Sequence, residues 1–194
     1  MSSGDSINFT NQFLIAMPGM LDDNFARTVV YMCEHTDKGA LGLVINRPIN
    51  ITLKGLFDKI ELSLGRQDLE DQPVFFGGPV QTERGFVLHD KIGMDDGPFN
   101  STLRIAGGAL EMTTSRDVLE AISSGAGPKR MLVTLGYSGW SAGQLEEEIT
   151  RNGWLTVDAD PAVIFDTPVE QRYERALSLL GFDPFMLSQE AGHA

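Results

Sequence analysis

The sequence predicts an α/β protein of the α+β type, in which a mixed, largely antiparallel β-sheet is surrounded by helices. Short β-branched and aromatic runs come in clusters and do not alternate strictly with helical patterns, so a doubly wound parallel sheet is not expected. The 21 glycines and 9 prolines indicate a chain that turns often. We expect one domain over residues 1–194, with a short flexible N-terminus at about 1–8 and a frayed tail at about 188–194.

The first third of the chain predicts a strand, a β-hairpin and a helix. Residues 13–17 are a short apolar run, which is typical of a buried strand. Residues 27–35 and 40–45 are rich in β-branched and aromatic side chains, and the polar turn between them predicts a hairpin. Thr52 is suited to cap a helix that runs to Ile60. The apolar side chains of this helix share one face: Leu53, Leu56, Phe57, Ile60.

The middle of the chain predicts short strands. Residues 74–76 form a buried apolar run, and residues 85–89 are expected to pair with it. Residues 93–100 contain Gly, Asp and Pro and are the least structured part. Residues 103–105 and 110–113 are further strands. This region therefore extends the sheet.

The last part predicts three helices and two strands. Each helix has a start or stop residue in the pattern: 115–123, 141–152, 169–180. Ser141 and Gln144 have the spacing of a capping box. Residues 129–135 and 154–157 are apolar and β-branched, as expected of strands.

Composition restricts the partners. The chain carries 15 Lys and Arg residues against 27 Asp and Glu residues, a formal net charge of −12, and has no Lys/Arg run. An acidic surface repels nucleic-acid phosphates and anionic lipids, so we expect neither direct nucleic-acid binding nor membrane binding. A protein partner or a small ligand fits this composition better.

The number of cysteines indicates the redox environment of the protein. Cys33 is the only cysteine, so no internal disulfide can form, as expected of a reducing environment. The N-terminal segment MSSGDSINFTNQF lacks the basic and apolar regions of a signal peptide, and no apolar run approaches the length of a bilayer span. We therefore expect a cytoplasmic protein.

Cys33 and His35 are the first candidate site. Residues two apart on a strand share a face, so we expect these side chains to lie on the same side of the sheet. A thiol nucleophile needs a base within hydrogen-bond reach, whereas side chains two positions apart on a strand are about 6–7 Å apart. The competing interpretation is a buried core thiol with a histidine at the strand end, because free cysteines are usually buried.

Residues 136–143, GYSGWSAG, are the second candidate site. A strand followed by a glycine-rich turn and a helix N-terminus presents backbone N–H groups to an anion or nucleotide. No Gly-Lys-Ser/Thr follows, as a P-loop requires, and Trp140 stands where a nucleophile elbow has glycine. The alternative is a tight strand-to-helix connection. The candidate binding residues are these: Gly136, Ser138, Gly139, Ser141, Gly143.

Gly77 and Gly78 form the third candidate, because two glycines at the end of a strand allow close backbone approach to a ligand or to another strand. The histidines are far apart in the sequence, and no metal-ligand spacing occurs. We therefore expect no metal site and no cofactor.

Four stretches, in this order along the chain, resemble the YqgE/AlgH family of bacterial proteins: FLIAMPGMLDDNFARTVVYMCEHTDKGALGLVINRP, FFGGPVQTERGFVLH, LGYSGWSAGQLEEEITRNGWL and LLGFDPFMLSQEAGHA. The resemblance covers nearly the whole chain and implies a single α/β domain whose bifurcated sheet includes a small barrel-like part. It implies no catalytic residue set. The family is largely uncharacterised, AlgH is named for a proposed role in regulating alginate synthesis, and some members are called transcriptional regulators.

The residues and the resemblance leave three functions open. A non-enzymatic regulatory module that binds a ligand or a protein is favoured, with any link to transcription indirect, because no constellation of residues is clearly catalytic. The first alternative is a hydrolase or thiol-dependent enzyme that uses Cys33 and His35 or the turn Gly136–Gly143. The second is an anion- or nucleotide-binding protein that uses the same turn.

Overall fold

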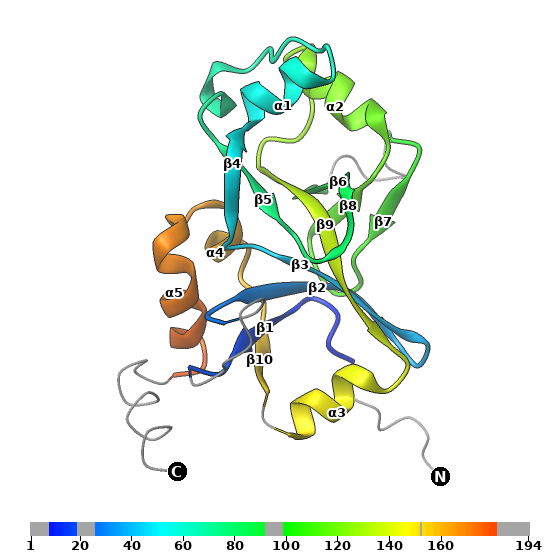
Figure 1. The fold of residues 1–194 in the computed structure, drawn as a ribbon, viewed down its shortest axis with the longest axis vertical. Helices are drawn as coiled ribbons and strands as arrows, with labels where there is room; N and C mark the ends of the chain where they lie inside the picture. Colours follow the sequence, from blue (N-terminus) through cyan, green and yellow to red (C-terminus); the bar gives the residue numbers. More distant parts are fainter. Residues whose placement is uncertain (1–7, 19–25, 92–98, 152, 182–194) are drawn as a thin grey trace.

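The computed structural model describes residues 8–18, 26–91, 99–151 and 153–181. Within these residues a curled, largely antiparallel sheet forms a half-barrel with five α-helices around it (Figure 1), which confirms the predicted fold class. The predicted flexible N-terminus, the frayed tail and most of the loops at 17–26 and 93–100 lie outside the described residues.

The sheet follows the order β10-β1-β2-β3-β9-β6-β8-β7, and β4 and β5 branch from it. The strands have these bounds: β1 Gln12–Ala16, β2 Val29–Thr36, β3 Gly39–Val44, β4 Pro48–Thr52, β5 Pro73–Phe76, β6 Val80–Asp90, β7 Thr102–Arg104, β8 Leu110–Thr113, β9 Met131–Ser141, β10 Trp154–Asp158. The predicted hairpin is confirmed, because β2 pairs antiparallel with β3.

Strand β9 is the point at which the sheet divides. One of its edges pairs antiparallel with β6. On the other edge, Thr134 and Leu135 pair parallel with β5, and residues 138–141 pair antiparallel with β3. The two branches therefore leave β9 at successive positions, as expected from the bifurcated sheet of the resembled family.

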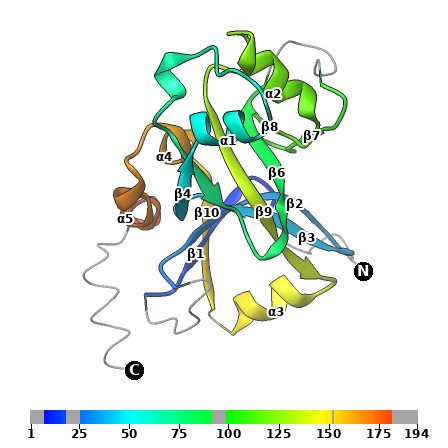
Figure 2. The ribbon, with the colours of Figure 1, turned by 45° about the horizontal axis from the view of Figure 1, so that its top comes forward.

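The α-helices cover the sheet at three places. They have these bounds: α1 Leu53–Lys59, α2 Arg116–Ser123, α3 Gln144–Thr150, α4 Pro161–Phe165, α5 Arg172–Ser178. Helices α1 and α2 lie at one end of the molecule and α3 at the opposite end, with α4 and α5 beside the sheet (Figures 1 and 2). No helix in the described part of the chain is long and apolar enough to cross a membrane.

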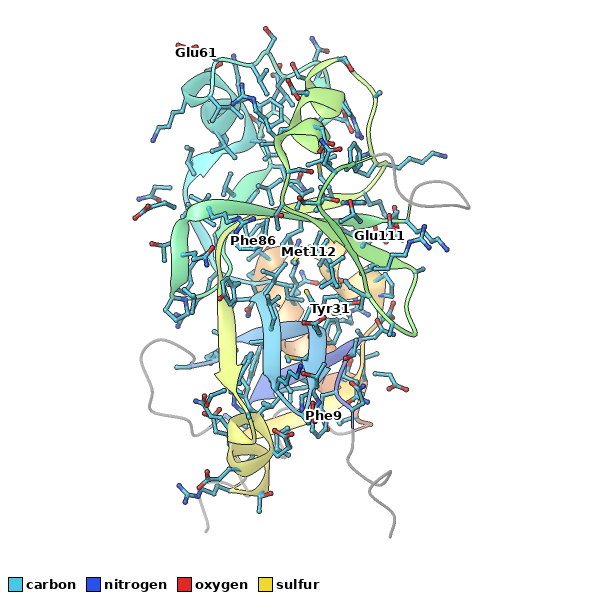
Figure 3. All side chains as sticks on the ribbon, turned by 90° about the vertical axis from the view of Figure 1, so that its right-hand side faces the viewer. Phe9, Tyr31, Glu61, Phe86, Glu111 and Met112 are labelled. Atoms are coloured by element: carbon cyan, nitrogen blue, oxygen red, sulfur yellow. The ribbon has the colours of Figure 1, made fainter. Side chains whose placement is uncertain are left out.

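Three apolar clusters fill the interior. The largest lies between the β6–β8 layer and strands β1 to β3 under α4 and α5, where Phe86 and Met112 face Tyr31 (Figure 3). The second lies under α3 and includes Phe9, which Figure 3 places toward that end of the molecule. The third lies under α1 and α2 and includes Leu53 and Phe57.

Two strand predictions need correction. Residues 85–89 do not pair with 74–76, because β9 lies between β5 and β6 and bonds to both. Strand β4 was not predicted, although Ile49 and Ile51 alternate with polar residues; it pairs only with β5, and Pro48 suits such an edge strand.

The residues that cap the helices agree only in part with those that the sequence predicts. Thr52 caps α1, because its Oγ1 accepts a hydrogen bond from the Gly55 N–H at 3.1 Å. Ser115 stands at the N-cap position of α2 but makes no side-chain bond to the helix backbone. The apolar segment at 162–165 belongs to α4, which Asp160 caps through the Ala162 N–H at 3.0 Å.

Candidate functional site

Cys33 lies inside the largest apolar cluster. Its side chain is 1% exposed, and its Sγ lies 3.8 Å from the backbone oxygen of Tyr31. Burial raises the pKa of the Cys33 thiol far above its ordinary value, and Glu34 adds to this effect. A nucleophilic thiol requires the opposite shift, so the geometry matches the core interpretation.

The predicted shared face of Cys33 and His35 is wrong. Met32 pairs with Gly42 and Glu34 pairs with Leu41, so Cys33 is the extra residue of a β-bulge. A bulge shifts the alternation by one residue, and His35 therefore turns to the side of the second cluster while Cys33 faces the first. The two side chains lie on opposite faces of the sheet.

His35 instead links the N-terminal segment to α3. The Phe9 N–H donates to His35 Nδ1 at 3.0 Å, and the two rings stack with centroids 5.3 Å apart. Because Nδ1 accepts, Nε2 carries the hydrogen that faces Glu146 Oε2 at 3.0 Å. Both ring nitrogens of His35 are thus bonded within the protein, one to Phe9 and one to Glu146, so His35 has a structural role here.

The predicted glycine-rich turn is part of a strand. Strand β9 continues through Gly136 and Gly139 to Ser141, and α3 begins only at Gln144. The helix has seven residues, and its first turn carries Glu146 and Glu147, which oppose an anion. Only residues 142 and 143 thus form the turn between β9 and α3, and the acidic start of this short helix disfavours the anion site that was expected there.

Gly77, Gly78, Gly136 and Ser138 do come together, at a place where two backbones cross. A Cβ at Gly77 would lie 2.3 Å from the Gly136 backbone oxygen, and a Cβ at Gly136 would lie 2.3 Å from that of Gly78. Gly136 has φ 79°, which also favours glycine. Ser138 Oγ donates to the Gly77 oxygen at 3.1 Å. We call these four residues the glycine crossing; it leaves no room for a ligand, and it is the close approach to another strand that the sequence allowed.

Gly77 also joins the two branches of the sheet. Its N–H donates to the Leu135 oxygen of β9, and its oxygen accepts from the Val44 N–H of β3, both at 2.9 Å. Gly139, Ser141 and Gly143 lie further along, next to α3. There Ser141 bonds Gln144, and Glu148 Oε1 accepts from the indole N–H groups of Trp140 and Trp154 at 3.0 Å each.

A groove between α1 and α2 is a candidate binding site that the sequence did not reveal. It has a volume of about 230 Å³, and its floor consists of β6, β8 and β9. Most of its lining is apolar: Leu56, Ile60, Val87, Leu119, Val133, Leu135. Gly85 lies in the floor, where an added Cβ would have its nearest neighbour, the Thr134 oxygen, at 4.0 Å. The groove is therefore unfilled at its centre.

The hydroxyl groups that line the groove are already bonded within the protein. Thr114 Oγ1 accepts from Arg84 at 3.3 Å, and Ser115 Oγ accepts from the Ser101 N–H and donates to Asp117. The two charged residues of the lining, Glu83 and Arg116, are exposed and form no ion pair among the described residues. Arg116 makes one bond, from Nη2 to the Ile60 oxygen of α1 at 3.0 Å.

A buried polar chain lies beside the groove, on the same face of the sheet, and includes the lining residue Thr113. His89 Nδ1 donates to the Asp90 carbonyl at 2.7 Å, so Nε2 accepts from the Thr113 hydroxyl at 2.8 Å. Thr113 in turn accepts from Thr102 at 2.9 Å. Burial lowers the pKa of His89, against the opposing effects of the Asp90 carbonyl, Glu111 and the Asp90 charge. His89 is therefore neutral and fully bonded.

The sequence contained a weak signal of the groove. Leu56 and Ile60 share the predicted apolar face of α1 with Leu53 and Phe57, yet the structure leaves them half-buried, and Leu119 of α2 is half-buried as well. The fully buried positions of these helices are Leu53, Phe57, Val118 and Ile122. The apolar faces of both helices are thus wider than the core requires, and the surplus lines the groove.

No group of three or more His, Cys, Asp or Glu side chains in the described ranges is arranged to hold a metal ion. The fold and the groove together define a class: an α+β chain whose described residues form a branched half-barrel with an apolar groove between two helices. A family model described as AlgH-like matches residues 13–185. The chain belongs to the AlgH-like family.

Relatives cover the whole chain. It is 65% identical over 195 residues to a UPF0301 protein of Ralstonia nicotianae, with 100% of both chains covered. The solution structure of the AlgH protein from Pseudomonas aeruginosa has a TM-score of 0.76 at 47% identity, again over 100% of both chains. A crystal structure from Corynebacterium diphtheriae, with a TM-score of 0.70 at 21% identity over 89% of this chain and 87% of that one, shares the fold.

Proposed function

We propose that this chain is a non-enzymatic regulatory module that binds a small apolar ligand in the groove between α1 and α2. The observation that carries the proposal is the unfilled floor around Gly85, where an added Cβ would have its nearest neighbour at 4.0 Å. Concave, mostly apolar sites with a few polar groups are the usual form of small-molecule sites. The volume of about 230 Å³ suits a ligand below drug size.

The contacts of Cys33, Ser138 and the residues before α3 argue against the alternative functions, an enzyme and an anion-binding protein. A thiol enzyme would need a reactive Cys33 beside a base, and Cys33 is buried on the opposite face from His35. A hydrolase that used Ser138 would need an accessible hydroxyl, whereas Ser138 is 1% exposed and bonded to Gly77. An anion at residues 136–143 would face the carboxylates of Glu146 and Glu147 in the first turn of α3, which begins directly after Gly143.

A regulatory role would then be indirect. The net charge of −12 disfavours contact with nucleic acid, so any effect on transcription would pass through the bound ligand or a protein partner. A single cysteine is consistent with action in the reducing cytoplasm.

The test uses a neutral probe of matched size, 4-methylpentan-1-ol, titrated into the full chain and followed by 15N–1H NMR. We expect saturable shifts at groove residues such as Val87 and Leu119. In Gly85→Leu, whose new side chain fills the floor, these shifts should disappear. The matched control Asn50→Leu adds the same side chain at an exposed position of β4 outside the groove lining, and it should bind as the wild type does. Absence of saturation, or shifts that persist in Gly85→Leu, would refute the proposal.

A further inference from the structure

The polar groups of the groove indicate the charge pattern of its ligand. Thr113, Thr114 and Ser115 are committed to bonds inside the protein. The Thr114 hydroxyl accepts its bond and keeps its hydrogen for a ligand, and the charged groups that line the groove are the carboxylate of Glu83 and the guanidinium of Arg116.

These two charges have opposite signs and do not neutralise each other. Neither forms an ion pair with any residue in the described ranges. Arg116 is held at the mouth of the groove by its bond to the Ile60 oxygen, which joins the start of α2 to the end of α1. Its other guanidinium N–H groups remain for an anionic group. Glu83 offers carboxylate oxygens to a cationic group from strand β6.

We infer that the groove binds an aliphatic zwitterion, of which a free branched-chain α-amino acid is the simplest form; this inference rests on the function proposed above. The aliphatic side chain would occupy the space over Gly85, Val87 and Val133. The ammonium group would contact Glu83, and the carboxylate would contact Arg116. A ligand with only a carboxylate would meet Glu83 as a like charge, and a ligand with only an amine would meet Arg116 in the same way.

The size of the groove agrees with this occupant. A folded protein partner needs an interface of roughly 1,000 Å² or more, and pockets for drug-sized ligands have volumes of about 300–1,000 Å³. The groove offers about 230 Å³, which is the scale of one aliphatic side chain with its polar end groups. Binding of a single amino acid would therefore fill it.

The experiment compares four probes in the full chain by isothermal titration calorimetry and NMR: L-leucine, N-acetyl-L-leucine, L-leucinamide and 4-methylpentan-1-ol. N-acetyl-L-leucine lacks the cation, and L-leucinamide lacks the anion. Charge-assisted hydrogen bonds predict that L-leucine binds about tenfold more tightly than either analogue.

Two variants test which protein residue contacts each charged group of the ligand. In Glu83→Gln the preference for L-leucine over N-acetyl-L-leucine should fall to about onefold to twofold, while the preference over L-leucinamide remains. In Arg116→Gln the reverse should hold. Each ratio is measured within one variant, so a change in groove shape caused by loss of the Arg116 bond to Ile60 cancels.

The outcomes separate the two claims. If all four probes bind equally and Gly85→Leu abolishes their binding, the zwitterion inference is overturned and the groove remains a binding site. If a preference for L-leucine persists unchanged in both charge variants, the inference is also overturned, because other groups provide the recognition. If no probe binds in the groove, the proposed function fails together with the inference.

Discussion

Two glycine positions beside strand β9 show opposite uses of the same residue. At the glycine crossing, a Cβ on Gly136 would lie 2.3 Å from the backbone oxygen of Gly78. At Gly85, on the other edge of β9, a Cβ would find its nearest neighbour at 4.0 Å. In the first place glycine lets two backbones touch. In the second it leaves space that nothing in the described chain fills.

The difference separates the part of the molecule that maintains the fold from the part that is free to bind. The glycine crossing holds both branches of the sheet to β9 through Gly77 and Ser138. The groove contributes little to holding the sheet together, because its central space makes no contacts. Substitutions at the two places should therefore have effects of very different size.

The largest effect is expected for Gly136→Ala. The positive φ costs roughly 1–2 kcal/mol in an L-residue, and overpacking against a backbone oxygen adds about 1–3 kcal/mol. We expect a loss of about 3 kcal/mol in the free energy of unfolding, measured by urea denaturation. Gly107→Ala is the matched control, since Gly107 has φ 81° and no atom within 4 Å of an added Cβ. Equal losses in both variants would mean that the crossing imposes no steric demand.

Cys33 provides an independent measure of the same effect. Because its thiol is 1% exposed and its pKa is raised by burial, alkylation should occur only through unfolding. A loss of about 3 kcal/mol in Gly136→Ala then predicts a labelling rate about 100-fold higher than in the wild type, since each 1.4 kcal/mol is a factor of about ten. The rate in Gly85→Leu should be about twofold to fivefold lower than in the wild type, because this variant is expected to be more stable by about 0.5–1 kcal/mol. Wild-type labelling at the rate of a free thiol would contradict the buried position of Cys33 and revive the thiol hypothesis.

Local patterns in the sequence predicted most elements, and contacts between distant residues explain the failures. The hairpin of β2 and β3 and the Thr52 cap of α1 depend on neighbouring residues, and both are confirmed. The pairing of 74–76 with 85–89 failed because β9, more than forty residues later, enters between the two strands. The bulge at Cys33 could not be foreseen, because it depends on the register with β3.

The candidate site was less predictable for a similar reason. Glycines at 136 and 139 predicted a turn because glycine is common in turns, but their function in β9 depends on what crosses the strand. Gly85 is also a glycine within a strand, but it leaves an open space, whereas Gly136 allows a close contact between two backbones. Only the surplus apolar positions Leu56, Ile60 and Leu119 pointed to the groove, and a helix alone does not show which of its apolar residues the core uses.

A smaller effect is expected from pH through His89, which is bonded to the groove residue Thr113. Burial lowers the pKa of His89 in the folded chain below its ordinary value of 6.5, so the unfolded chain binds a proton more readily. Stability from this residue is complete above about pH 6.5 and falls as the pH drops through and below that value. Between pH 7.5 and 5.5 the wild type should lose more stability than His89→Gln, by an amount that linkage limits to about 1.4 kcal/mol.

Urea denaturation at the two pH values gives this difference. Carboxylates such as Glu111 and Asp90 are present in both proteins, so their contributions largely cancel in the comparison. Equal pH dependence in wild type and His89→Gln would show that His89 is not held neutral by its surroundings.

The smallest effect on stability, and the sharpest contrast with Gly136, is expected for Gly85→Leu. Glycine in a strand weakens it, and an added Cβ has its nearest neighbour at 4.0 Å, so the new side chain has space to bury apolar surface in the groove. We expect the free energy of unfolding to rise by about 0.5–1 kcal/mol, while binding of 4-methylpentan-1-ol is lost. A loss of stability as large as that of Gly136→Ala would mean that the space over Gly85 is needed by the fold. A gain in stability with a loss of binding would mean instead that the chain keeps this glycine at a cost to its own stability, as expected where an empty space serves a ligand.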